Sequence, residues 1–222
     1  MGFFDRLRPG ADAGQAPPGA GAPDRAPDEA ASPDRPARVE QLEWLEESAR
    51  DLVSPAFLGH DDVHEALLEQ YVEDDELDLT EGDVGSVLER VWAERLQQEA
   101  GWTDEGDYTR VAAAFAALEA DGIVARMGFT CCQTCGHAEI GDEAGPSSRG
   151  YVFFHEQDAE RLGPGGSDLF LAYGGFEAPP EVVAGEVVAA LTAQGLTVEW
   201  DGTTAARVMV TGVDWRKRVP RT

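Results

Sequence analysis

The chain has 222 residues, of which 43 are Asp or Glu and 17 are Lys or Arg, so its formal net charge is −26. This length allows one domain of ordinary size plus an extension, and it excludes a large multidomain machine. The excess of acid repels phosphate and anionic lipid, which argues against binding to nucleic acid or to a membrane surface. A basic protein partner remains compatible with the charge.

The N-terminal head, residues 1–38, has the composition of a disordered segment. Seven of the 13 prolines lie between Pro9 and Pro36, among Ala, Gly, Asp and Arg, without apolar periodicity. No apolar run reaches the length of a signal peptide, and none approaches the roughly 20 residues of a membrane helix. We therefore expect a cytoplasmic protein whose folded part begins near Val39.

Apolar residues at helical spacing predict four helices after the head. The first stops before Ser54 and Pro55, and the third opens with Thr80 and Asp83 in the positions of a capping box. The fourth stops at the turn formed by Asp121 and Gly122. These predicted helices span residues 39–52, 63–71, 80–96 and 104–118.

The acidity is concentrated in the helical portion. Between Glu40 and Asp107 there are 22 acidic residues and three arginines, so 19 of the 26 net negative charges lie there (22 − 3 = 19). One interpretation is the solvated face of a helical portion, and the other is a docking surface for a basic partner.

The apolar period changes from helical to alternating after Gly122, which predicts strands. Pro179 and Pro180 begin one further helix that Gly195 ends, and Trp200 to Gly202 form the turn of a terminal hairpin. The chain therefore predicts a single α+β domain over residues 39–218: a helical portion (39–121), then a mainly antiparallel sheet with one or two packed helices (122–218). The predicted strands span residues 123–130, 151–155, 168–173, 196–200 and 207–211.

All three cysteines lie within five residues, as Cys131, Cys132 and Cys135, and His137 follows them. The Cys-x-x-Cys spacing of Cys132 and Cys135 is that of a zinc knuckle or of a thiol redox pair. If the preceding strand continues through Cys131 and Cys132, their side chains project from opposite faces. We therefore place Cys132, Cys135 and His137 ahead of Cys131 as zinc ligands, with His155 as a remote fourth candidate.

Three roles stay open for the cysteine cluster: reduced thiols that pack or close a turn, a metal site, and a thiol redox site. A redox pair usually lies at the start of a helix in a strand-helix-strand unit, and no clear helix is predicted after Cys135. A reducing cytoplasm also disfavours a permanent disulfide.

His155 follows the apolar run from Tyr151 to Phe154, where a strand gives way to a turn. It is a candidate site residue, and the alternative is a half-buried histidine hydrogen-bonded to a neighbour. A catalytic zinc would also need a general base, for which Glu139, Glu156 and Asp158 are candidates by proximity in sequence. No complete phosphate-binding loop or nucleophile elbow is present.

Four blocks together resemble an uncharacterised bacterial family, a domain of unknown function found mostly in high-GC Gram-positive bacteria. The resemblance covers about Val39 to Arg218 and is strongest after Gly122, with the cysteine block as its most specific element. It implies one recurring domain that excludes the head, and it implies no activity or ligand. The blocks are Phe129 to Gly136, Gly150 to Asp158, Leu171 to Gly174 and Val198 to Gly202.

These observations favour a non-enzymatic interaction protein, such as an adaptor or an immunity-like protein, whose acidic surface engages a basic partner. The alternative is a zinc-binding or thiol-redox protein that uses Cys131, Cys132, Cys135 and His137.

Overall fold

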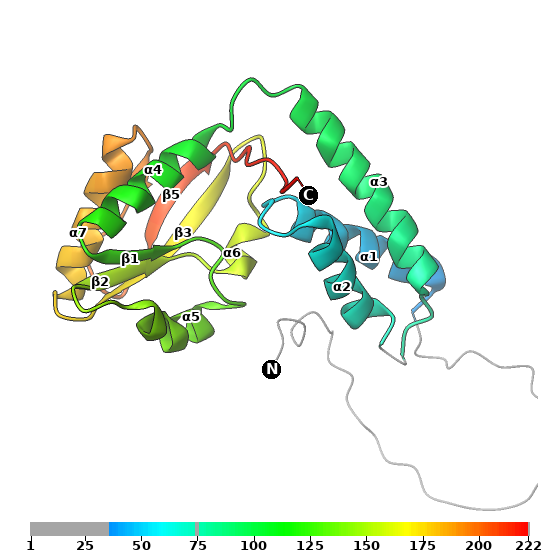
Figure 1. The fold of residues 1–222 in the computed structure, drawn as a ribbon, viewed down its shortest axis with the longest axis horizontal. Coiled ribbons are helices and arrows are strands. Elements are labelled where there is room, and N and C mark those ends of the chain that lie inside the picture. Colours follow the sequence, from blue (N-terminus) through cyan, green and yellow to red (C-terminus); the bar gives the residue numbers. More distant parts are fainter. Residues whose placement is uncertain (1–35, 74–75, 222) are drawn as a thin grey trace, which may run out of the picture.

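The computed structural model describes residues 36–73 and 76–221 (Figure 1). The head predicted to be disordered lies outside the described residues, apart from its last three. A helical part and a sheet part lie side by side, and the end of the chain lies between them (Figure 1). This is the α+β fold, helices first and sheet second, that the order of predicted elements indicates.

The helical part consists of α1 (Arg38–Val53), α2 (His60–Tyr71) and α3 (Glu81–Ala100), which confirms the first three predicted helices. The predicted capping box also forms: the amide of Asp83 donates to Oγ1 of Thr80 at 3.3 Å, and the amide of Thr80 donates to Oδ2 of Asp83 at 2.8 Å. Among the described residues, no helix is both long and apolar enough to cross a bilayer. The three helices enclose their own core, built on Leu45, Ala49, Val53, Val63, Leu67, Val84, Leu88 and Val91.

The fourth helix, α4 (Asp107–Ala120), packs on the sheet part and not on α1, α2 and α3. Its apolar residues Val111, Ala114, Phe115 and Leu118 belong to the core of the sheet part. The boundary between the two cores therefore falls before α4, whereas the helical portion predicted from the sequence extends to residue 121.

The sheet has five strands in the order β1-β2-β3-β5-β4. All neighbouring pairs are antiparallel except β1 and β2, which run parallel. Each predicted strand is present, but β1 ends four residues earlier than expected. The strands are β1 (Ile123–Arg126), β2 (Gly150–Phe153), β3 (Ser167–Gly175), β4 (Val198–Glu199) and β5 (Val208–Val213).

Alternation along the strands gives the sheet two faces, and each of them carries buried residues. Helices α4 and α7 (Pro180–Ala193) cover one face, over Val152, Leu169 and Leu171. On the other face, the helix α5 (Gln133–Glu139) and the 3₁₀ turn η1 (Ile140–Glu143) lie over β1 and β2, and Ile140 packs with Phe153. The sequence predicts α4 and α7, whereas α5 is absent from the prediction. The short helix α6 (Glu156–Ala159) follows β2.

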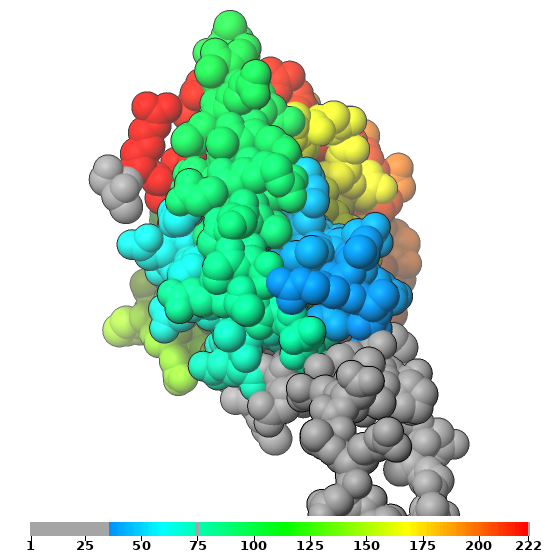
Figure 2. All heavy atoms as spheres, turned by 90° about the vertical axis from the view of Figure 1, so that its right-hand side faces the viewer, coloured from blue at the N-terminus to red at the C-terminus, as the bar shows by residue number. Residues whose placement is uncertain are grey.

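The C-terminal segment joins the two parts. Trp215 is fully buried in the sheet core, and its indole NH donates to the carbonyl of Pro55 beyond α1 at 3.1 Å. Further along, Nη2 of Arg95 on α3 donates to the carbonyl of Lys217 at 2.7 Å. Figure 2 shows α3 running along the face of the helical part, with the last residues of the chain beside it. The segment therefore acts as a strap that fixes α3 to the sheet.

A half-buried acid, Glu160, lies at the end of α6 near Asp51 of α1. Burial, together with the negative charge of Asp51, raises the pKa of Glu160 from 4.5 to about 7. The folded protein therefore binds a proton at Glu160 between about pH 4.5 and pH 7 that the unfolded chain releases. The stability from this proton is complete below pH 4.5 and is lost as the pH rises to 7.

Replacing Glu160 by glutamine is therefore expected to raise the free energy of unfolding at pH 8, by about 1 kcal/mol once solvent screening is allowed for. The replacement should also flatten the decline in stability between pH 5 and pH 7. Urea unfolding at a series of pH values measures both effects, with exposed Glu69 replaced by glutamine as the control. Equal pH dependence in the wild type and Glu160→Gln would contradict the assignment.

Candidate functional site

The cysteine cluster lies on the loop that leaves β1 and on the first turn of α5. After Arg126 the chain turns through Gly128, at φ 57°, and Thr130, at φ 59°, and Cys132 then caps α5. The carbonyl of Thr130 accepts from the amide of Glu156 at 3.0 Å, which fixes the loop to α6. The strand prediction through residue 130 is therefore wrong, because the chain has already turned away from the sheet.

A glycine lets α5 lie directly on the sheet. Gly136 is buried, and a Cβ at this position would lie 2.3 Å from the ring of Phe153 on β2. The expectation that no helix follows the cysteines is therefore wrong as well. Because β1 and β2 are parallel and α5 lies between them in the chain, the cysteines occupy a strand-helix-strand unit at the start of its helix.

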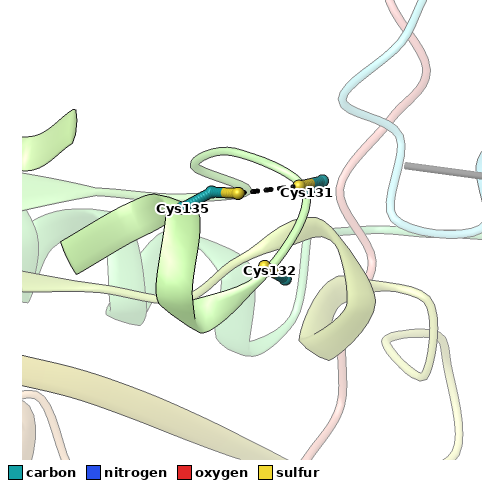
Figure 3. A group of neighbouring side chains, drawn as sticks. All are labelled: Cys131, Cys132 and Cys135. Atoms are coloured by element: carbon teal, nitrogen blue, oxygen red, sulfur yellow. Dashed lines mark hydrogen bonds between the residues drawn. The ribbon is translucent and has the colours of Figure 1, made fainter. Parts of the chain in front are cut away.

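The three sulfur atoms face one another. Their Sγ atoms all lie within 4.8 Å of one another, and Sγ of Cys131 is 3.4 Å from Sγ of Cys135 (Figure 3). All three are free thiols, and all are partly exposed. Cys135 lies on the first turn of α5, and the loop before the helix places Cys131 and the N-cap residue Cys132 against that turn. The opposite-face constraint from strand geometry does not apply here.

The thiols differ in acidity. Hydrogen bonds from the backbone and the thiol of Cys135 lower the pKa of the Cys132 thiol below its usual value. Hydrogen bonds with the thiols of Cys131 and Cys132 raise the pKa of Cys135 to about 12, and burial and repulsion from the neighbouring thiolates act in the same direction. The cluster therefore favours a single negative charge unless a cation compensates the others.

His137 lies on a different face of α5 from Cys135, since two helical positions are about 200° apart around the axis. Its Nδ1 is 2.9 Å from the hydroxyl of Tyr151, and its ring packs edge-on against Phe153 at 5.2 Å. Burial and the positive charge of Arg207 lower the pKa of His137. The structure does not bring His137 into the group of three sulfurs.

His155 is buried and caps α6. Its Nδ1 accepts from the amide of Asp158 at 3.2 Å, and its Nε2 lies 2.9 Å from Oδ2 of the same residue. Both ring nitrogens are therefore occupied within α6, as in the hydrogen-bonded alternative. Asp158 also pairs with Arg207, and the bonds from His155 and Arg207 lower its pKa although burial acts to raise it.

The three candidates for a general base, Glu139, Glu156 and Asp158, lie in different surroundings. Glu139, at the end of α5, is exposed, whereas Asp158 is engaged by His155 and Arg207. Burial raises the pKa of Glu156, which begins α6 beside Thr130. Arg207 itself was not recognised from the sequence, because nothing in its local pattern shows that β5 brings it to α6.

Residues 38–219 match one family model, described as a domain of unknown function (DUF6891). The matched range nearly coincides with residues 39–218, over which the blocks of the sequence resemble a family of unknown function. No curated protein and no solved structure matches the chain.

Proposed function

The chain belongs to the DUF6891 family, and we propose that it binds a soft metal ion, zinc, through the thiolates of Cys131, Cys132 and Cys135. The observation that carries the proposal is the convergence of three sulfur atoms within 4.8 Å of one another. Zinc is bound by thiolate at about 2.3 Å, and two ligands of a tetrahedral site then lie about 3.8 Å apart. The sulfur positions therefore suit one ion with little movement of the loop.

The exposure of the thiols supports this role over packing. A cysteine that only packs behaves as a small apolar residue and is among the most buried residue types. All three thiols here are partly exposed, and the buried residue of α5 is Gly136. Packing of α5 on the sheet therefore rests on Gly136 and Ile140, which leaves the sulfurs available to a ligand.

A bound cation would also remove the repulsion between the thiolates of the cluster. Without one, deprotonation of Cys132 opposes deprotonation of Cys135, whose pKa is raised to about 12. A divalent ion neutralises two thiolate charges, and metal binding is accordingly accompanied by release of protons.

The proposed site has three protein ligands and one further position. Neither His137 nor His155 belongs to the group, because Tyr151 holds the first and Asp158 holds the second. Structural zinc sites have four protein ligands, whereas a site with three keeps a position for water or a small ligand. The proposed site is therefore of the open kind.

Cysteine substitution tests the proposal in the full chain. Protein purified without chelator is expected to carry about one zinc ion per chain by elemental analysis, and replacing Cys132 and Cys135 by serine should abolish the binding. In the wild type, added cobalt should give the thiolate-to-metal charge-transfer absorption, which the double variant should lack. Replacing Cys131 by serine should weaken binding strongly, whereas His137→Ala should keep the metal.

Three results would contradict the proposal. Metal-free protein whose three thiols titrate normally and which takes up neither zinc nor cobalt would do so. So would formation of a reversible disulfide under mild oxidant with no metal uptake by the reduced protein, a result that would assign the cluster to thiol redox chemistry. Retention of zinc by Cys132→Ser/Cys135→Ser would place the ion elsewhere.

A further inference from the structure

Within the part of the chain that the structure describes, α5 and η1 leave the β3-β5-β4 end of their sheet face uncovered. On this face Phe170 of β3 pairs with Met209 of β5, and Met209 pairs with Glu199 of β4, so the three residues form a row across the strands. Helix α5 and η1 cover Phe153 and Ala172 further along the same face but do not reach this row. Phe170 and Met209 are half-buried and form the floor of a shallow groove of about 680 Å³.

One wall of the groove is held in place by hydrogen bonds. The indole NH of Trp200 donates to the hydroxyl oxygen of Tyr173 at 3.1 Å, and that hydroxyl lies 2.9 Å from the carbonyl of Ala206. The amide of Thr203 donates to Oδ1 of Asp201 at 2.8 Å, which closes the turn. The loop between β4 and β5 is therefore organised before any ligand arrives, which reduces the entropy lost on binding.

The charges along the groove are unbalanced. At one end Arg207 lies over the ring of Phe170 at 5.5 Å and pairs with Asp158, so its charge is compensated. At the other end are the carboxylates of Glu199 and Asp201, and neither forms an ion pair within the part of the chain that the structure describes. The groove thus combines an apolar floor with an uncompensated negative rim.

We propose that this groove docks a basic segment of a partner protein, with an apolar side chain over Phe170 and Met209 and an arginine or lysine beside Glu199 and Asp201. The aliphatic stem of such a cation suits the apolar floor formed by Phe170 and Met209. The net charge of −26 adds long-range attraction for a basic partner and repels nucleic acid and anionic lipid. The proposal does not depend on the thiol site.

Binding of a capped hexapeptide to the full chain tests the proposal. The probe contains two arginines and two phenylalanines, and its counterpart has both arginines replaced by glutamates. Saturable binding of the first peptide alone, weakening as salt is raised, is expected by calorimetry or fluorescence anisotropy. Replacing Glu199 by glutamine and Asp201 by asparagine together should weaken binding about tenfold. Met209→Gln should weaken it severalfold at unchanged net charge.

The matched control is Glu65→Gln/Glu69→Gln, which removes the same charge from exposed positions on α2, outside the groove. This control should bind the peptide nearly as the wild type does. Equal losses in the two double variants would reduce the attraction to general surface charge and overturn the proposal. Absence of saturable binding, or equal binding of the glutamate peptide, would overturn it as well. Circular dichroism of each variant confirms that the fold is retained.

Discussion

Replacing Glu99 by alanine is expected to lower the free energy of unfolding by about 3–5 kcal/mol, because it leaves a buried guanidinium without its counter-ion. Glu99 is 1% exposed and Arg95 is 5% exposed. Oε1 of Glu99 lies 3.2 Å from Nε of Arg95 and accepts from the amide of Val219 at 2.7 Å. One substitution therefore breaks the ion pair and releases the strap formed by the C-terminal segment.

The surroundings of Arg95 explain why losing Glu99 lowers the free energy of unfolding so much. Burial lowers the pKa of Arg95, although Glu99 acts to raise it. Its guanidinium lies over Trp102, 4.8 Å from the ring centre, and donates to the carbonyl of Lys217. None of these contacts supplies the negative charge that Glu99 provides. Arg95→Met in the Glu99→Leu background should recover much of the stability, because an apolar pair of similar volume needs no compensation.

Urea unfolding of Glu99→Ala beside Glu94→Ala measures the difference. Glu94 pairs with Arg50 on the exposed surface of α3, with 52% of its side chain exposed, so its loss should cost less than about 1 kcal/mol. If Glu99→Ala proves no more costly than Glu94→Ala, the strap does not stabilise the contact between the two parts.

The sequence pattern predicts most elements because their signals are local. The apolar spacing of α1 to α4 and the capping box at Thr80 are each contained within one turn or one helix. The parallel pairing of β1 with β2 depends instead on how α5 returns the chain, and no local pattern encodes it. The sequence pattern also does not predict that α4 packs on the sheet, because the apolar face of α4 suits either core.

In the candidate site, too, local spacing predicts some features and the tertiary fold determines the others. The spacing of Cys132 and Cys135 suffices to predict that two sulfurs meet, whereas the inclusion of Cys131 follows only from the helix that starts at Gln133. That helix has seven residues and no apolar periodicity, so periodicity cannot predict it. The same helix directs His137 toward Tyr151 instead of toward the thiols.

Gly136 is the residue on which both the fold of α5 and the proposed metal site depend. Replacing it by alanine would place a methyl group 2.3 Å from Phe153, so α5 must move away from β2 or the ring must leave its position. Overpacking of this kind costs about 1–3 kcal/mol. Because Cys132 and Cys135 lie on the first turn of α5 while Cys131 lies on the loop, a displaced helix also separates the sulfurs.

We therefore expect Gly136→Ala to weaken zinc binding by about 10–100-fold, comparable to the loss of a group that orients metal ligands, although no ligand is changed. Phe153→Leu alone should keep the metal, and Gly136→Ala/Phe153→Leu should recover much of the affinity, because the smaller side chain makes room for the methyl group. Competition with a chromophoric chelator measures the affinities, and urea unfolding follows stability in parallel. If Gly136→Ala lost stability but bound zinc as tightly as the wild type, the position of α5 on the sheet would not determine the geometry of the three thiols.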